Sequence, residues 1–170
     1  MFGLWELGAV TRFAASFGAV VFADQARRTL VEYAQLNDAA SEAGGILLGR
    51  LIAGTNDIVV DRATAPNAAD RRSRFGFRRS RQGSQVEVDR AWHTSSGTCV
   101  YLGEWHSHPE DDPTPSSRDI ADQGRILAKT TCEQQDLLFV IVGRESVAIW
   151  EGSRVSRVTR LVGRALLTEF

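Results

Sequence analysis

Residues 100–119 read VYLGEWHSHPEDDPTPSSRD, and this stretch combines the signals of a strand, a loop and a helix with candidate metal ligands. Val100 to His106 carries residue types that favour a β-strand. The prolines from Pro109 to Pro115 interrupt regular structure, because proline lacks a backbone N–H and fixes its own φ angle. Ser116 then stands where a helix begins, and the helix continues to about Lys129. The stretch therefore predicts a strand, a returning loop and a helix.

Two histidines and an aspartate in this stretch have the spacing of metal ligands. His106 and His108 are two residues apart at the end of the predicted strand, so their rings lie on one face. The loop is long enough to bring Asp119, in the first helical turn, beside that strand end. Ser116 precedes Asp119 by three residues and faces the same side. Three protein ligands with one position left for water are typical of catalytic zinc, so we expect one Zn²⁺ per chain.

Each half of this pattern is common when it occurs alone. Ordinary strands contain His-x-His, and a serine three residues before an aspartate opens many helices. Here the two halves occur together, with seven residues between His108 and Ser116, and a Glu42-x-Gly-Gly segment lies upstream. The combination favours a metal site over two unrelated structural features.

Residues 42–49 read EAGGILLG and begin an apolar strand. Gly44 and Gly45 permit close approach of a neighbouring element or of a substrate, and we predict that they contact the substrate. Glu42 precedes the strand and is the candidate general base. Its carboxylate would take a proton from the attacking water and pass it to the leaving amine.

The remaining segments alternate between helical and strand patterns. Asp24 is the expected N-cap of one helix, and Ser84 with Glu87 has the spacing of a capping box for another. The expected helices cover residues 24–36 and 84–94, and the expected strands cover 44–51, 58–60, 137–142, 147–150 and 155–162. These elements predict an α/β fold of the α+β type, in which helices flank a mixed β-sheet with hairpins. We expect residues 1–170 to form a single domain.

Charge and cysteine content narrow the choice of partners and compartment. Twenty basic and twenty-one acidic residues give a net charge of −1, so the overall field offers no argument for nucleic acid or an anionic membrane. Cys99 and Cys132 lie in no metal-binding spacing, which favours reduced thiols and a cytoplasmic protein. Glu6 and Arg12 interrupt the apolar residues 1–22, so we expect neither a signal peptide nor a membrane helix there.

An arginine-rich segment between residues 71 and 81 admits three interpretations. Its charges can keep an exposed edge soluble, or hold carbonyls and carboxylates of an extended peptide, or contact nucleic acid. We favour the first two and place nucleic acid last. For the peptide interpretation, Arg74 and Arg78 are the candidate substrate-binding residues. The segment also contains Phe75 and Phe77, and its arginines are Arg71, Arg72, Arg74, Arg78, Arg79 and Arg81.

Together, EAGGILLG at residues 42–49, HSHP at residues 106–109 and SSRD at residues 116–119 resemble the signature of the JAB/MPN (JAMM) isopeptidase family. The resemblance implies a cytidine-deaminase-like domain. It also implies that His106, His108 and Asp119 bind zinc. Ser116 would stabilise the oxyanion, and Glu42 would act as the acid and base.

Residues 24–152 are similar to prokaryotic members of this family that are encoded beside ubiquitin-like transfer enzymes. The resemblance implies a substrate in which a ubiquitin-like or other protein modifier is conjugated to a target. In CBASS anti-phage operons the target is a nucleotidyltransferase, whereas in Bil operons a ubiquitin-like protein is joined to other targets. Two alternatives remain: a non-catalytic MPN-type scaffold, and a JAB hydrolase acting on a sulfur-carrier protein or a small-molecule amide.

Overall fold

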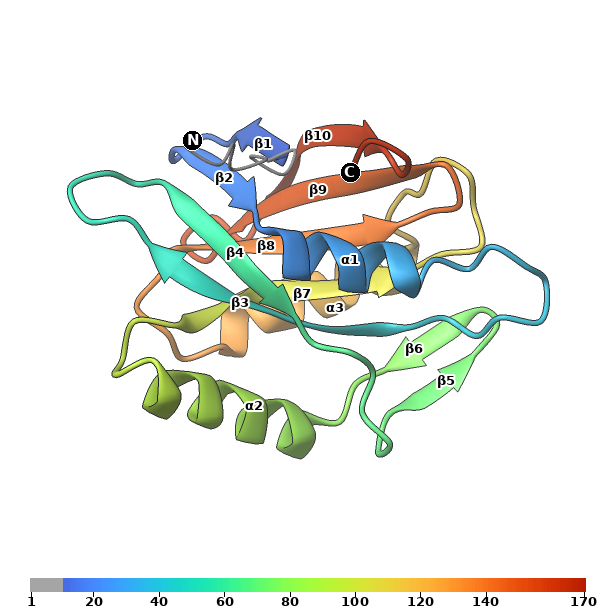
Figure 1. Cartoon of the computed structure of the whole chain (residues 1–170), viewed down its shortest axis with the longest axis horizontal. Helices are drawn as coiled ribbons and strands as arrows, with labels where there is room; N and C mark the ends of the chain where they lie inside the picture. Colours follow the sequence, from blue (N-terminus) through green and yellow to red (C-terminus); the bar gives the residue numbers. More distant parts are fainter. Residues whose placement is uncertain (1–10) are drawn as a thin grey trace, which may run out of the picture.

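The computed structural model describes residues 11–170, and its largest feature is an eight-stranded mixed sheet (Figure 1). A separate two-stranded sheet is formed by β5 and β6. The strands are β1 (Thr11–Ala14), β2 (Ala19–Phe22), β3 (Gly44–Leu51), β4 (Ile58–Ala63), β5 (Arg71–Ser73), β6 (Gly76–Arg78), β7 (Val100–Ser107), β8 (Asp136–Val142), β9 (Ser146–Ser153) and β10 (Thr159–Leu166). The helices are α1 (Asp24–Glu32), α2 (Arg81–Thr94) and α3 (Ser117–Lys129).

The large sheet has the strand order β1-β2-β4-β3-β7-β8-β9-β10. β7 lies in the middle, antiparallel to β3 and parallel to β8. The β7–β8 connection contains α3, as a crossover between parallel strands requires. The expected mixed sheet with hairpins is confirmed, including the β3–β4 and β8–β9 hairpins.

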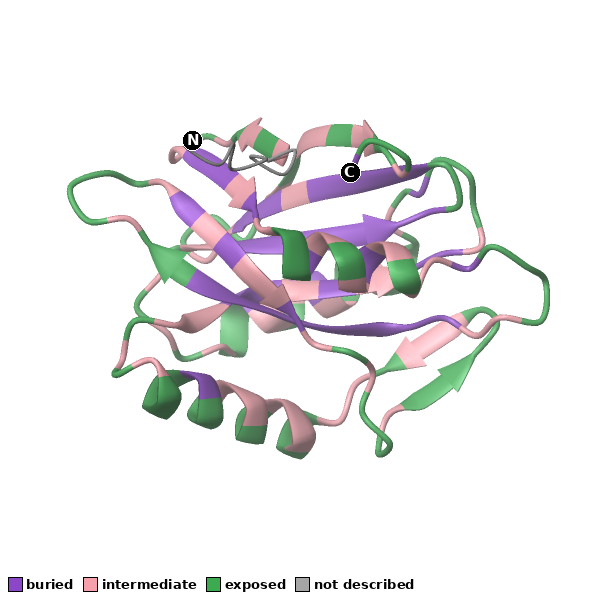
Figure 2. Cartoon of the chain, in the orientation of Figure 1, coloured by how far each residue is buried: buried purple, intermediate pink, exposed green. Residues whose placement is uncertain are grey.

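The helices cover both faces of this sheet, and the alternation of side chains along β3 shows which helix covers which face. Leu47 packs in the same apolar cluster as Leu30 of α1, whereas Ile46 and Leu48 pack against Ala91 of α2. The central strands are therefore buried on both sides, as Figure 2 shows for β3 and β8. α3 contributes Leu127 to a cluster with Leu137 and Phe139 of β8.

Several of the expected helix caps and element boundaries are wrong. Ala23, not Asp24, is the N-cap of α1, and no side chain caps this helix, because Asp24 instead pairs with Arg27. α1 also ends at Glu32 rather than near Leu36.

The N-terminus of α2 lies earlier than its predicted capping box. Ser80 is the N-cap, and its hydroxyl accepts a hydrogen bond from the N–H of Gly83 at 3.3 Å. Ser84 lies inside the helix and donates to the Ser80 carbonyl, while Glu87 pairs with Arg62 and Arg90. Local spacing alone did not distinguish the two serines.

The last strand begins at Thr159, later than expected, because residues 154–158 form the turn that follows β9. The N–H of Arg157 donates to the Ser153 carbonyl, and Arg157 itself has a left-handed φ of 58°. β1 and β2 were not predicted at all; β2 pairs in parallel with β4 and extends the sheet. The expectation that residues 1–22 hold no signal peptide or membrane helix falls partly outside the described residues.

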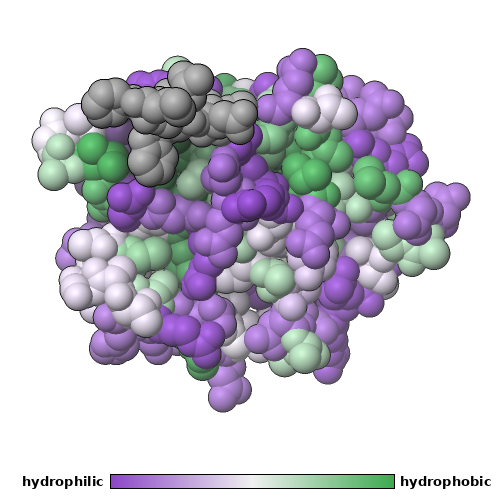
Figure 3. All heavy atoms as spheres, in the orientation of Figure 1, coloured by the Kyte–Doolittle hydropathy of each residue, from purple (hydrophilic) through white to green (hydrophobic). Residues whose placement is uncertain are grey.

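Within residues 11–170, no helix combines the length and apolar character needed to cross a membrane. Hydrophilic residues cover much of the face in Figure 3, and hydrophobic residues lie in separate groups between them. Cys99 and Cys132 are both free and half-buried, as expected for reduced thiols.

Candidate metal and catalytic site

The two histidines lie at the carboxyl end of β7, where the strand still pairs with both neighbours. His106 pairs with Gly44 of β3 and with Ile141 of β8. The N–H of His108 donates to the Val142 carbonyl at 2.8 Å, which fixes the backbone just beyond the strand. The Nε2 atoms of His106 and His108 are 2.9 Å apart, so the two rings converge on one point as the sequence predicted.

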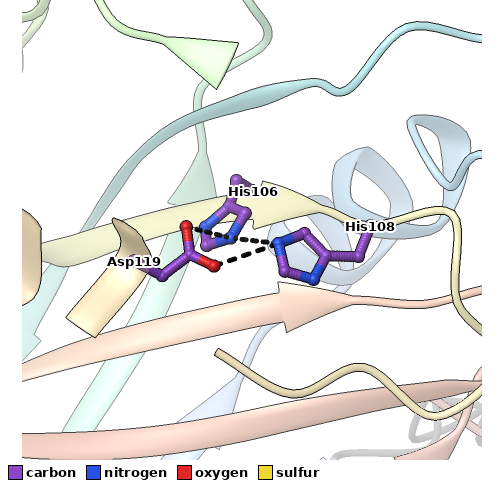
Figure 4. A group of neighbouring side chains, drawn as sticks. All are labelled: His106, His108 and Asp119. Atoms are coloured by element: carbon purple, nitrogen blue, oxygen red, sulfur yellow. Dashed lines mark hydrogen bonds and ion pairs between the residues drawn. The ribbon is translucent and has the colours of Figure 1, made fainter. Parts of the chain in front are cut away.

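Asp119 reaches the same point from the first turn of α3. Its Oδ1 lies 3.3 Å from Nε2 of His106, and its Oδ2 lies 3.2 Å from Nε2 of His108 (Figure 4). Ser116 orients this carboxylate as the N-cap of α3. Its hydroxyl and its backbone N–H lie 2.6 and 2.7 Å from Oδ2, and the hydroxyl also accepts from the N–H of Asp119.

These three side chains fit a tetrahedral metal ion. Their ligand atoms all lie within 4.8 Å of one another. Bonds of about 2.0–2.1 Å at tetrahedral angles place neighbouring ligand atoms about 3.3 Å apart. In the structure the two Nε2 atoms are 2.9 Å apart, and each lies 3.2–3.3 Å from one of the two Asp119 oxygens. Two imidazoles and one carboxylate form a donor set that zinc accepts, and three ligands leave a position open.

The charges of the site stabilise one another. Burial opposes ionisation of Asp119, but hydrogen bonds from His106 and His108 overcome it and hold the pKa of Asp119 well below its usual range. Burial also disfavours the charged form of His108, yet its hydrogen bond to Asp119 raises the pKa of His108 above its ordinary value. The aspartate is therefore an anion, as a metal ligand must be.

Glu42 lies beside this group through the strand register. Ser107 donates its backbone N–H to the Ala43 carbonyl at 2.8 Å, which continues the pairing of Gly44 with His106. One residue further, Glu42 stands opposite His108, on the face that carries both histidine rings. The residue is only 7% exposed. Burial raises the pKa of Glu42, and the neighbouring His106 and His108 oppose part of that rise.

The structure gives the two glycines a role inside the protein. A Cβ at Gly44 would overlap the Phe77 ring of β6, and a Cβ at Gly45 would overlap Thr64. The close approach inferred from the sequence thus exists, but its partners in this structure belong to the chain itself. Whether substrate also passes these glycines stays a prediction.

The arginine-rich segment forms the β5–β6 hairpin beside the site. Arg74 pairs with Asp38 at 2.8 Å, and its guanidinium lies 5.0 Å from the centre of the Phe75 ring. Arg78 is exposed on β6. Arg74 and Arg78 therefore remain predicted, not observed, contacts of a substrate.

Sequence reasoning missed a contact of the same hairpin with Glu42. The Nε of Arg72 donates to the backbone carbonyl of Glu42 at 2.8 Å, and the N–H of Glu42 donates to the Ser73 carbonyl at 2.8 Å. These contacts depend on the fold that brings residues 72–73 to residue 42. The only sequence signal was the density of arginines, which did not single out Arg72.

Comparison with known proteins identifies the class to which this fold and site belong. Residues 23–155 match the family model described as prokaryotic homologs of the JAB domain. The chain belongs to that family, which confirms the resemblance seen in the sequence.

Several relatives carry one name, "CD-NTase/cGAS isopeptidase". The relative from Pseudomonas aeruginosa (strain BWHPSA011 / Pa011) is 39% identical over 75% of this chain and 79% of its own length. The relative from Escherichia coli (strain TW11681) is 33% identical over 80% of this chain and 82% of its own length. The relative from Vibrio cholerae serotype O1 is 35% identical over 74% of this chain and 75% of its own length.

A solved structure supports the fold independently. The solution structure of protein DSY2949 from Desulfitobacterium hafniense superposes with a TM-score of 0.58, at 20% identity, over 84% of this chain and 88% of that one. At this identity the likeness concerns the fold alone.

Proposed function

We propose that this chain is a zinc-dependent isopeptidase that cleaves the amide bond between a conjugated protein modifier and its target in anti-phage defence. The observation that carries the proposal is the convergence of His106, His108 and Asp119 within 4.8 Å, with Glu42 opposite His108 in the strand register. This is the arrangement of a hydrolytic site, in which a metal ion and a carboxylate act on the same water molecule.

Each residue has a separate task in the reaction. A bound zinc ion would polarise the scissile carbonyl and lower the pKa of a coordinated water. Glu42 accepts the proton of the attacking water and delivers it to the nitrogen of the leaving amine, so no net proton is lost. Burial favours this exchange because it raises the pKa of Glu42 toward the working pH. Ser116 lies next to Asp119, from where its hydroxyl would donate to the oxyanion.

The relatives' names favour one substrate class among those that the sequence left open. They act, by name, on a CD-NTase, so we propose that the target here is also a nucleotidyltransferase, as in CBASS operons, rather than the targets of a Bil system. The modifier's C-terminal tail would lie extended along the start of β3, past Gly44 and Gly45, with Arg74 and Arg78 holding its polar groups.

Two other functions are less well supported. A non-catalytic scaffold does not require three side chains that could hold a metal ion, so the convergence of His106, His108 and Asp119 favours the hydrolase. A sulfur-carrier or small-molecule hydrolase would use the same metal site. The relatives' names do not point to either substrate.

The direct test uses a nucleotidyltransferase joined through an amide to the C-terminus of its modifier. We expect the zinc-loaded wild type to separate the two proteins. Glu42→Gln should keep stoichiometric zinc by elemental analysis and lose at least about 10²-fold in turnover, because only the proton transfer is removed. His106→Ala should lose both zinc and turnover.

Glu145→Gln is the matched control, because Glu145 is an exposed glutamate with the same change of charge. It should cleave like the wild type. Absence of cleavage by the wild type would contradict the proposal, and so would equal turnover of wild type and Glu42→Gln. Full zinc occupancy in His106→Ala would instead contradict the ligand assignment.

A further inference from the structure

A buried glutamine that the reaction does not use lies behind the metal ligands. Gln35 follows α1, in the segment that leads to Glu42, and is only 1% exposed. Its Oε1 accepts a hydrogen bond from the Ser107 hydroxyl at 3.2 Å. Its Nε2 donates to the carbonyls of Ala40 and Arg74 at 3.1 and 3.0 Å. A buried side chain with three hydrogen bonds to three separate segments holds those segments in a fixed relation.

The chemistry of these contacts requires an amide of this length. Both N–H groups of Gln35 are used by carbonyls, and its oxygen is used by a hydroxyl. A carboxylate offers no donor to the two carbonyls, and an apolar side chain leaves buried polar groups without a partner. Asparagine carries the same amide but is one methylene shorter, so it does not have the length that these contacts require.

The first end of this network is the strand that carries the metal ligands. Ser107 lies between His106 and His108, fully buried, and points to the opposite face of β7. Its hydroxyl accepts from the N–H of Ala43 at 2.9 Å while donating to Gln35. This one hydroxyl therefore ties the peptide next to Glu42 to the peptide between the two histidines.

The other end is the β5–β6 hairpin, which lies next to the loop between α1 and β3 in Figure 1. Gln35 binds the Arg74 carbonyl at the turn of this hairpin. The same hairpin holds both backbone groups of Glu42, through the Ser73 carbonyl and the Arg72 guanidinium. Gln35 thus closes a ring of contacts that runs through Ser107, Ala43, Glu42 and the hairpin.

We propose that Gln35 is a positioning residue for the isopeptidase reaction, which sets Glu42 against the two histidines by joining Ser107 to the β5–β6 hairpin. The expected loss of turnover rests on the proposed function, whereas the expected loosening of the segment around Glu42 does not. Removal of groups that hydrogen-bond to the residues of a metal site commonly lowers activity or metal affinity 10–100-fold. A side chain that only filled space would affect the stability of the whole fold and leave turnover of the folded protein unchanged.

The test compares Gln35→Met with Arg154→Gln as the matched control. Methionine keeps the length and removes all three hydrogen bonds. Like Gln35, Arg154 joins separate parts of the chain through hydrogen bonds. It is half-buried, and its guanidinium donates to the carbonyls of Thr130, Cys132 and Gln134. Those carbonyls lie between the end of α3 and the start of β8, at the opposite end of these elements from the site. Loss of the hydrogen bonds of either side chain weakens the fold, but only Gln35 contacts the segments that surround Glu42 and the two histidines.

Two measurements on the zinc-loaded protein, made well below its unfolding temperature, give the result. The turnover number of Gln35→Met should fall about 10–100-fold with less than about a threefold change in the Michaelis constant. Amide hydrogen exchange at Glu42 and Ala43 should accelerate at least about tenfold, while exchange at Val140 in the core of β8 changes less. Arg154→Gln should leave turnover and both site amides as in the wild type.

A second variant keeps the test decisive if Gln35→Met does not fold. Gln35→Glu keeps the acceptor for Ser107 and loses both donors, so it should accelerate exchange at Glu42 more than at Ala43. Wild-type turnover in a folded Gln35 variant, or uniform acceleration of all amides, would overturn the positioning role. An inactive wild type would instead overturn the proposed function, and the exchange measurements would still decide whether Gln35 holds Glu42 in place.

Discussion

Ser116 makes two kinds of contact at once, because it caps α3 and hydrogen-bonds to the carboxylate of Asp119, the proposed metal ligand. Its hydroxyl accepts from the N–H of Asp119 and donates to the Asp119 carboxylate, so the cap and the ligand share one hydrogen-bond pair. To stabilise an oxyanion, the Ser116 hydroxyl would have to turn its proton from Asp119 to the substrate. The sequence predicted that Ser116 caps the helix and stabilises the oxyanion, and a variant that separates these two roles is needed.

Ser116→Ala and Ser80→Ala form such a pair, since each removes the N-cap hydroxyl of a helix. Both should lower the free energy of unfolding by about 1 kcal/mol, the usual cost of a lost cap, in urea denaturation. Only Ser116→Ala should also lower the turnover number, by about 10²–10³-fold, if the hydroxyl stabilises the oxyanion. A Ser116→Ala enzyme with wild-type turnover and reduced stability would show that the serine is a cap and nothing more.

The residues of the site could be foreseen because their signals are local. His106 and His108 lie on one face by strand periodicity, and Ser116 with Asp119 marks a helix start. Gln35 could not be foreseen in this way. Its partners Ala40, Ser107 and Arg74 are 5, 72 and 39 residues away in the chain, and an isolated glutamine carries no pattern.

At the scale of elements, the sequence predicts apolar strands better than polar ones. β3 and β8 are buried on both faces, and their uninterrupted apolar runs made them visible. All three residues of β5 are exposed, and β5 and β6 are three residues each, so their arginines suggested only an edge or a loop. The expected capping residues Asp24 and Ser84 were wrong for a related reason: serine and aspartate fit several positions near a helix N-terminus, and tertiary packing decides among them.

The β5–β6 hairpin is the element in which we place recognition of the modifier tail. Arg74→Gln and Arg78→Gln should each raise the Michaelis constant for the conjugate about three- to tenfold and leave the turnover number unchanged, because they remove ground-state contacts. The effect should shrink as salt concentration rises, since the contacts are exposed.

Arg90→Gln on α2 is the control for this experiment, because it neutralises an exposed arginine that also pairs with an acid, Glu87. Its kinetics should match those of the wild type. Unchanged kinetics in Arg74→Gln and Arg78→Gln would favour the other interpretation, in which these charges keep an exposed edge soluble.

At the scale of the whole molecule, the site exists only when three distant parts of the chain have folded together. Glu42 precedes β3, the histidines end β7, and Asp119 begins the helix that crosses from β7 to β8. The mixed order of the sheet places β7 between β3 and β8, so Glu42, the proposed general base just before β3, comes beside the proposed histidine ligands at the end of β7. A metal ion that binds all three ligands therefore binds the folded chain and not the unfolded one.

Zinc should for this reason stabilise the protein in proportion to its affinity. Free zinc at about 100 times its dissociation constant adds about 2.7 kcal/mol to the free energy of unfolding. For a chain of this length that corresponds to a rise of about 5–10 °C in the unfolding midpoint. Scanning calorimetry of metal-free protein with and without zinc should show this rise in the wild type and lose it in Asp119→Ala. Glu42→Gln should keep most of the rise, because Glu42 is assigned to the proton and not to the metal. Equal stabilisation of the wild type and Asp119→Ala would mean that zinc binds elsewhere on the chain, and it would remove Asp119 from the ligand set.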